Sequence, residues 1–272
     1  MRIKNVGYQI FRPFLKIFVI LFMCPKTIHK ERIPKKGGII LAGNHLTKLD
    51  PIIVGNTTPR SLHFLSKKEL LDIPTYGCYN LHGSLLPKYR GASPIQQSLI
   101  NGDKVTGMSL MEMTKGMDEG DVFDIEAIEI EENDNNSSLF IKMADAAKTL
   151  ILRDADKLVS GQLTRTKQDE NLVTYCHMIK PEQEHIDFNL TATQILGWIK
   201  ALSDVPGAYL YIEEIKYKIF KASIFSFDVT HEVGQIVKAD KNGLVIQCRE
   251  GQLSILEIQK EGKKRMDYKS FL

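Results

Sequence analysis

The order of strand-like and helical segments after residue 78 constrains the fold of this 272-residue chain more than any other feature. Alternating apolar residues predict strands, and longer amphipathic segments predict helices. The helix predicted at 138–159 begins at an Asn/Ser cluster and is ended by Gly161, as helix-capping preferences favour. This order predicts an α/β domain. The first group of elements is strand, helix, strand, strand and helix, over residues 79–81, 94–101, 105–113, 122–130 and 138–159.

A second group of elements follows residues 164–175, which we expect to be an exposed strand or linker. Residues 191–202 predict an amphipathic helix, because Ile195, Ile199 and Leu202 fall on one stripe. Hairpin turns are predicted at 240–243 and at 250–251. Several short strands at this spacing predict a small open β-barrel. The predicted strands are residues 208–212, 217–226, 234–239, 244–249 and 252–259.

The N-terminal region differs from the rest of the chain in charge. Residues 1–74 contain 13 Lys and Arg against 4 Asp and Glu, whereas residues 75–272 contain 23 against 29. The uninterrupted apolar run at 17–24 is much shorter than the about 20 residues that span a bilayer. We therefore expect residues 1–30 to contact a membrane surface as an amphipathic segment, or alternatively to form a buried helix.

Composition and cysteine spacing narrow the class of protein. Hydrophobic residues make up 43% of the chain and charged residues 25%, which excludes a wholly disordered or collagen-like protein. The four cysteines are far apart and form no CxxC pair, so we expect no metal site. Their sparsity is typical of a reducing compartment, and we expect a cytoplasmic protein that is peripheral to the membrane if residues 1–30 bind lipid.

Polar residues with catalytic potential concentrate between residues 80 and 121. Asn80 and His82 are two positions apart, so a strand would place both side chains on one face. An amide and an imidazole side by side can stabilise a developing oxyanion, and the imidazole can also move a proton. Asp118 lies on a turn bounded by glycines, and the turn at 84–87 could pair with a flat heterocycle. Taken singly, a histidine such as His82 is more often structural than catalytic, and an aspartate such as Asp118 is usually a turn former.

Residues 71–272 resemble the formyltransferases that use 10-formyltetrahydrofolate, methionyl-tRNA formyltransferases in particular. The resemblance rests on NLHGSLLPKYRGASPIQQSLINGD, TGMSLMEMTKGMDEGDVF, PGAYL and LEIQKEGKKRM. It implies a partial Rossmann-like sheet that lacks its first half, followed by a tRNA-binding barrel. It also implies that the chain formylates the α-amine of initiator methionyl-tRNA with the folate as co-substrate. The implied residues are Asn80, His82 and Asp118 for catalysis, Ser84, Leu85, Leu86 and Pro87 for folate, and Lys260, Lys263, Lys264 and Arg265 for tRNA.

The basic group at 260–265 suits phosphates, although a solvated tail explains it equally well. Residues 10–70 instead resemble the 1-acyl-glycerol-3-phosphate acyltransferases, through the stretches at 33–51 and 62–70. That resemblance implies that His45 is a general base and that Asp50 orients it. The phosphate-binding FPEGTR-type block of that family has no counterpart in the sequence.

We therefore expect a chimera of an α/β acyltransferase-like fragment and a formyltransferase. The predicted parts are residues 1–74 for the fragment, 75–165 for the second half of the catalytic domain, 166–190 for a linker and 191–272 for the barrel. The predicted function is formylation of methionyl-tRNA by a monomer. The alternatives are an acyltransferase remnant at a membrane surface and an inactive fusion.

Overall fold

The computed structural model describes residues 77–240 and 243–271. The chain divides into two compact units, Met1–Leu70 and Leu71–Leu272. The predictions made for residues 1–76, including the amphipathic segment and the pair His45 and Asp50, lie outside the described residues.

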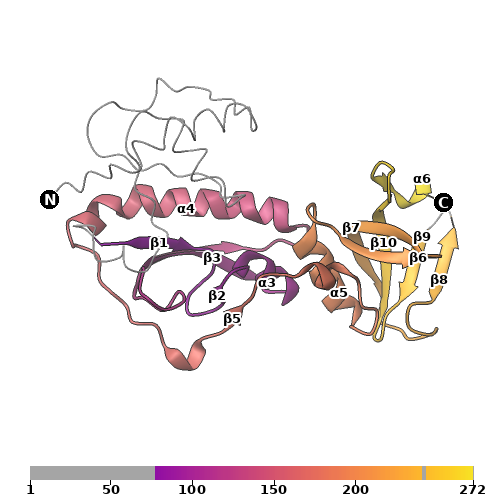
Figure 1. The fold of residues 1–272 in the computed structure, drawn as a ribbon, viewed down its shortest axis with the longest axis horizontal. Helices are drawn as coiled ribbons and strands as arrows, with labels where there is room; N and C mark the ends of the chain where they lie inside the picture. The colour runs from indigo at the N-terminus through magenta and orange to yellow at the C-terminus, as the bar shows by residue number, and fades with distance from the viewer. Residues whose placement is uncertain (1–76, 241–242, 272) are drawn as a thin grey trace, which may run out of the picture. The chain divides into compact units, whose positions relative to one another are not determined.

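A three-stranded sheet holds the first group of elements (Figure 1). Strand β3 (Val105–Glu112) is central, with β1 (Tyr79–His82) on one side and β4 (Val122–Glu129) on the other. Both pairings are antiparallel, whereas a Rossmann-like sheet would be mainly parallel. The difference has a local cause for β4, since a loop of nine residues joins it to β3 and a parallel neighbour needs a longer crossover.

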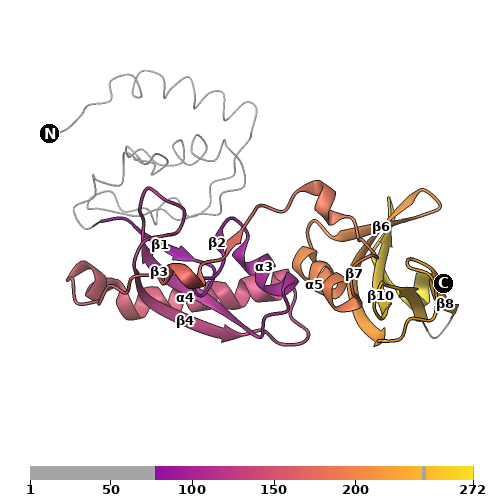
Figure 2. The same cartoon turned by 90° about the horizontal axis from the view of Figure 1, so that it is seen from below.

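Two helices pack with this sheet. Helix α3 (Pro94–Ile100) lies between β1 and β3 in sequence, and α4 (Asn136–Val159) follows β4 and runs along the sheet (Figures 1 and 2). Asn135 and Ser138 cap α4 reciprocally, which confirms the start that the Asn/Ser cluster predicts. The buried residues of α4 recur at helical spacing and form one face of the helix. Each fully buried leucine stabilises the fold by roughly 1.5–3 kcal/mol. Its apolar residues are Leu139, Met143, Ala146 and Leu150.

The second group forms a mixed unit of one helix and a larger sheet. Helix α5 (Ala192–Leu202) is capped by Thr191 and buries Ile195, Ile199 and Leu202, as predicted. Within the described residues the sheet order is β6-β7-β10-β9-β8, so β6 and β8 are its edges and closure into a barrel is not seen. The strands are β6 (Ala208–Ile212), β7 (Ile215–Ser226), β8 (Ile236–Asp240), β9 (Gly243–Gln247) and β10 (Gln252–Lys260), with β11 (Met266–Asp267) paired to β10 and α6 (Tyr268–Phe271) after it.

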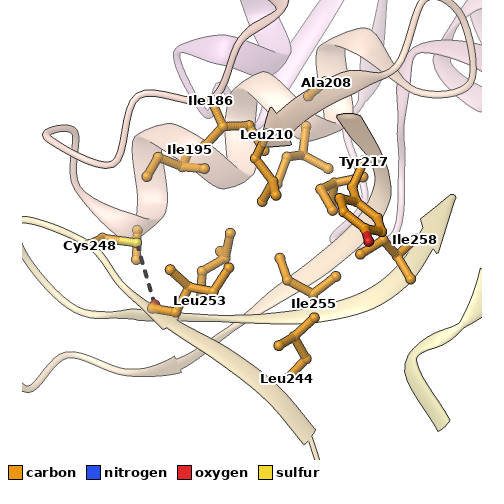
Figure 3. Close-up of a cluster of buried hydrophobic side chains, with 14 of the residues drawn as sticks. Ile186, Ile195, Ala208, Leu210, Tyr217, Leu244, Cys248, Leu253, Ile255 and Ile258 are labelled. Carbon is orange, nitrogen blue, oxygen red and sulfur yellow. Dashed lines mark hydrogen bonds between the residues drawn. The ribbon is translucent and has the colours of Figure 1, made fainter. Parts of the chain in front are cut away.

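The core of this second group lies between α5 and the sheet. Figure 3 shows Ile195 of α5 facing Leu210 and Leu253 from the strands. Leu253 and Ile255 of β10 alternate and are fully buried, which is the pattern of a strand with one face in a core. A register shift follows Ile255, and Ile258 after it is also fully buried. These strands match the predicted positions because hairpin turns and alternation are local signals.

The segment between the two groups departs from the prediction of an exposed strand or linker. Most of its residues are exposed, but Gln168 and Cys176 are buried. It contains a short 3-10 turn (Glu170–Leu172) and a two-residue strand, β5 (Tyr175–Cys176). Strand β5 pairs in parallel with β2 (Arg90–Gly91), which brings the segment beside the residues that follow β1.

No helix in residues 77–240 and 243–271 is long and apolar enough to cross a membrane.

Candidate active site

Strand β1 positions two of the three predicted catalytic residues. Asn80 pairs with Met111 and His82 with Ser109 across the antiparallel ladder with β3. Because the two residues are separated by one position on the strand, both side chains project from the same face of the sheet. His82 is 4% exposed and Asn80 is partly buried, so the pair forms the inner wall of the site.

Both ring nitrogens of His82 face acceptors. Its Nε2 lies 2.9 Å from the Tyr89 carbonyl oxygen, and its Nδ1 lies 3.6 Å from Oδ2 of Asp118. A carbonyl oxygen only accepts, so Nε2 carries hydrogen and donates to Tyr89. An imidazolium could donate on both sides, whereas a neutral ring with hydrogen on Nε2 leaves a lone pair toward the carboxylate. The Tyr89 carbonyl thus fixes the Nε2 side of the ring, and the Nδ1 side faces the Asp118 carboxylate.

Asp118 is held in place from two directions. The backbone N–H of Gly91 donates to its Oδ2 at 2.9 Å, and this is the same oxygen that faces His82. Its backbone φ is 49°, in the left-handed region that is uncommon for residues other than glycine. The glycine-bounded turn predicted from sequence thus brings a carboxylate to the imidazole, and Asp118 and His82 are neighbours as predicted.

The turn at Ser84, Leu85, Leu86 and Pro87 follows directly on β1. Ser109 of β3 fixes it, because its hydroxyl donates to the Ser84 carbonyl at 2.6 Å and accepts from the Leu86 N–H at 3.1 Å. The Ser84 hydroxyl donates to the Lys88 carbonyl. Two of the backbone groups predicted to pair with a heterocycle are therefore already bonded to Ser109. The folate assignment of this turn stays a prediction.

Several residues that the sequence did not single out complete the site. The Cys176 thiol donates to the Tyr89 carbonyl, the acceptor that also binds His82. Burial raises the pKa of this thiol above its ordinary value, so it stays protonated as a donor. Arg90 is 2% exposed and pairs with Glu170 at 2.9 Å. Burial, the largest single influence, would lower the pKa of its guanidinium, but the interactions with Glu170 and Tyr175 together outweigh burial and raise it.

The basic group predicted to bind tRNA lies on the second group of elements. Lys260 ends β10, and Lys263 and Lys264 are exposed in the turn that follows. Arg265 differs, because it pairs with Asp204 and Glu257 and lies over the Phe220 ring with 4.4 Å to the ring centroid. Burial alone would lower the pKa of Arg265, but its two carboxylate partners raise it. Two carboxylates of the chain thus already balance the charge of Arg265. An arginine that binds a tRNA phosphate is expected to have its charge unpaired.

Among the described residues, no group of three or more His, Cys, Asp or Glu side chains could hold a metal ion. Cys78, Cys176 and Cys248 are all buried.

Two family descriptions match most of the chain between them. Formyl transferase matches residues 60–154, and formyl transferase, C-terminal domain, matches residues 178–272. Among curated proteins, a methionyl-tRNA formyltransferase of Lactobacillus acidophilus is 37% identical over 263 residues, covering 91% of this chain and 83% of that protein. The chain belongs to the methionyl-tRNA formyltransferase family. Another such formyltransferase, from Lactobacillus gasseri, is 41% identical over 91% of this chain and 79% of its own length, and one from Malacoplasma penetrans is 39% identical over 75% and 64%.

Solved structures of formyltransferase type share the fold. An N-formyltransferase from Helicobacter canadensis, in complex with folinic acid and dTDP-3-aminofucose, has a TM-score of 0.55 at 21% identity, covering 67% of this chain and 65% of that one. HypX from Aquifex aeolicus in complex with tetrahydrofolic acid has a TM-score of 0.54 at 16% identity, covering 71% and 34%. At these identities the likeness concerns the fold alone.

The comparisons do not support the acyltransferase-like fragment or the chimera. The formyl transferase match begins at residue 60, inside the segment predicted to be the fragment. Residues 75–272 are less than three-quarters of the chain, so a match over 91% of it also includes residues before 75. The formyltransferase family therefore extends further toward the N-terminus than its motifs alone indicate.

Proposed function

We propose that the chain transfers the formyl group of 10-formyltetrahydrofolate to the α-amine of methionyl-tRNA. The observation that supports this most directly is the position of His82. Its ring lies between the Tyr89 carbonyl and the Asp118 carboxylate, two residues after Asn80 on the same strand face. Membership of the family supplies the reaction, and this geometry supplies the groups that perform it.

In this mechanism the amine nitrogen attacks the formyl carbon, and the formyl oxygen gains negative charge. The Asn80 amide N–H is the donor for that oxygen, because an uncharged donor fixed on a strand needs no reorganisation as charge develops. His82 Nε2 is bonded to Tyr89, so Nδ1, which lies beside the Asp118 carboxylate, is the nitrogen that can exchange a proton.

The Asp118 carboxylate, 3.6 Å from Nδ1, stabilises a positive ring and takes part in removing the amine proton. Collapse of the tetrahedral intermediate then breaks the bond between the formyl carbon and N10 of the folate, and the proton passes to N10. The products are formyl-methionyl-tRNA and tetrahydrofolate.

The test is formylation of methionyl-tRNA by the full chain with 10-formyltetrahydrofolate, compared with the Asn80→Ala variant. Loss of one oxyanion donor should lower kcat by on the order of 10²–10³. Asn133→Ala serves as the control, since Asn133 is an exposed asparagine in the turn before α4. An inactive parent chain, or an Asn80→Ala variant with unchanged kcat, would refute the proposal.

The finer predictions concern other parts of the chain. Preference for the initiator tRNA, a monomeric state and contact of residues 1–30 with a membrane surface remain predictions. Acyl transfer to lysophosphatidate depends on His45 and Asp50, and phosphatidate formation by the same preparation would support that alternative.

A further inference from the structure

Gln168 is a buried amide in a segment of mostly exposed residues. It is 6% exposed, while Lys167 and Asp169 on either side are exposed. Its Nε2 donates to the carbonyl oxygens of Asp118 at 2.8 Å and Gly120 at 2.7 Å. Its Oε1 accepts from Nε of Arg90 at 3.0 Å. The Gln168 side chain thus links the loop that contains Asp118 to β2, the strand that Arg90 opens.

The two bonds to the Asp118 loop fix a backbone that its own conformation does not favour. Left-handed backbone is unfavourable at a residue other than glycine, and Asp118 has a φ of 49°. Gly120, two residues on, lies so close to β3 that a Cβ would be 2.0 Å from the Glu112 carbonyl oxygen. The loop is therefore held against β3 on one side and by the Gln168 amide on the other.

The bond to Arg90 acts on the same carboxylate by a second route. Arg90 opens β2, and the next residue, Gly91, donates its N–H to Oδ2 of Asp118. Gln168 therefore holds the Asp118 backbone directly and, through Arg90, the strand that binds the Asp118 side chain. Both routes end at the oxygen that faces His82 Nδ1.

We propose that Gln168 is a positioning residue that sets the orientation of Asp118 relative to His82. This proposal rests on the proposed function only in that the orientation of Asp118 matters for formyl transfer. The hydrogen bonds of Gln168 themselves are independent of any substrate. Gln168 bonds to the two loops that hold the reacting groups and acts on the reaction through Asp118.

Two variants separate positioning from packing. Gln168→Glu keeps the size of the side chain and an acceptor for Arg90, but an ionised carboxylate cannot donate to either carbonyl. Gln168→Ala removes all three bonds. Gln162→Ala is the matched control, because Gln162 is an exposed glutamine just after α4.

The first measurement is independent of activity. In the ¹⁵N-labelled full chain, the Gly91 amide reports on the Asp118 carboxylate that it binds. We expect its resonance to move and its hydrogen exchange to accelerate by about tenfold or more in both Gln168 variants, with no change in Gln162→Ala. An unchanged Gly91 amide in Gln168→Glu would overturn the proposal.

The second measurement is kinetic. Misplacement of Asp118 should lower kcat by on the order of 10²-fold in both Gln168 variants, while KM for the folate stays within about twofold. A Gln168→Glu variant with the kcat of the parent would show that only size and the Arg90 bond matter, and would overturn the proposal. An inactive parent would refute the proposed function instead, and the Gly91 amide would still decide whether Gln168 positions Asp118.

Discussion

Replacement of Gly91 by alanine tests how tightly β5 is held against the active site. Gly91 has a φ of 121°, which side chains rarely adopt, and a Cβ there would lie 2.1 Å from the Cys176 carbonyl oxygen. The contact is to backbone, so β5 has to move away. Such backbone strain costs on the order of 1–3 kcal/mol.

Displacement of β5 also breaks hydrogen bonds. The Arg90 N–H donates to the Thr174 carbonyl and the Ala92 N–H to the Cys176 carbonyl, at 2.9 and 3.2 Å. Each such bond contributes about 1 kcal/mol. Together with the strain, Gly91→Ala should lower the free energy of unfolding by about 3–5 kcal/mol.

Gly102→Ala is the matched control. Gly102 also has a positive φ, of 67°, but a Cβ there meets no atom within 4 Å. Gly102→Ala should therefore lower the free energy of unfolding only by the cost of left-handed backbone, about 1–2 kcal/mol. Urea unfolding of the parent and both variants measures the difference. Equal losses in the two variants would refute the inference that β5 is packed against Gly91.

Three further predictions concern the turn, an acidic group and the basic loop. Ser109→Ala leaves two backbone groups of the turn after β1 without their partner, so the free energy of unfolding in urea should fall by about 1–3 kcal/mol and KM for the folate should rise; an unchanged unfolding midpoint would contradict this. Burial raises the pKa of Asp134, but its bonds to Lys142, to Ser138 and to the Glu131 backbone outweigh burial and lower it below the ordinary 3.8. Its stabilising contribution is therefore present above about pH 4 and lost as the pH falls through the folded pKa, so Asp134→Asn should flatten the acid side of a stability-against-pH curve. Joint replacement of Lys263 and Lys264 by alanine should weaken tRNA binding and reduce the slope of log affinity against log salt by about 0.7–0.9 for each phosphate that the variant no longer neutralises; an unchanged slope would show that neither lysine binds phosphate.

The elements that depend on local signals were predictable. Helix α4 starts where Asn135 and Ser138 cap it, and β9 and β10 are separated at Gly251, which has a φ of 80° that suits glycine. Asn80 and His82 were predictable as neighbours because strand alternation is also local. The antiparallel partner of β1 was not predictable, because β2 and α3 lie between β1 and β3 in sequence and no tight turn joins the two strands.

The parts of the site that escaped prediction depend on residues distant in sequence. Gln168 is 50 positions from Asp118 and 78 from Arg90, so nothing near it in the chain signals its burial. Charge alone groups Arg265 with the neighbouring lysines, yet its partner Asp204 is 61 positions away. A run of charged residues in sequence says that a surface is polar, but only the fold shows which charges are already paired.

The segment between the two groups of elements therefore belongs to the active site as much as to the connection. A boundary after residue 165 would separate the catalytic loops from Gln168, from Thr174, whose hydroxyl accepts the Tyr89 N–H, and from Cys176. At its far end the same segment is fixed to β6, where the Ile186 N–H donates to the Tyr209 carbonyl at 2.8 Å. The smallest unit with an intact site therefore extends through Cys176. The segment is polar and mostly exposed, so its composition does not indicate the few buried residues that hold the site.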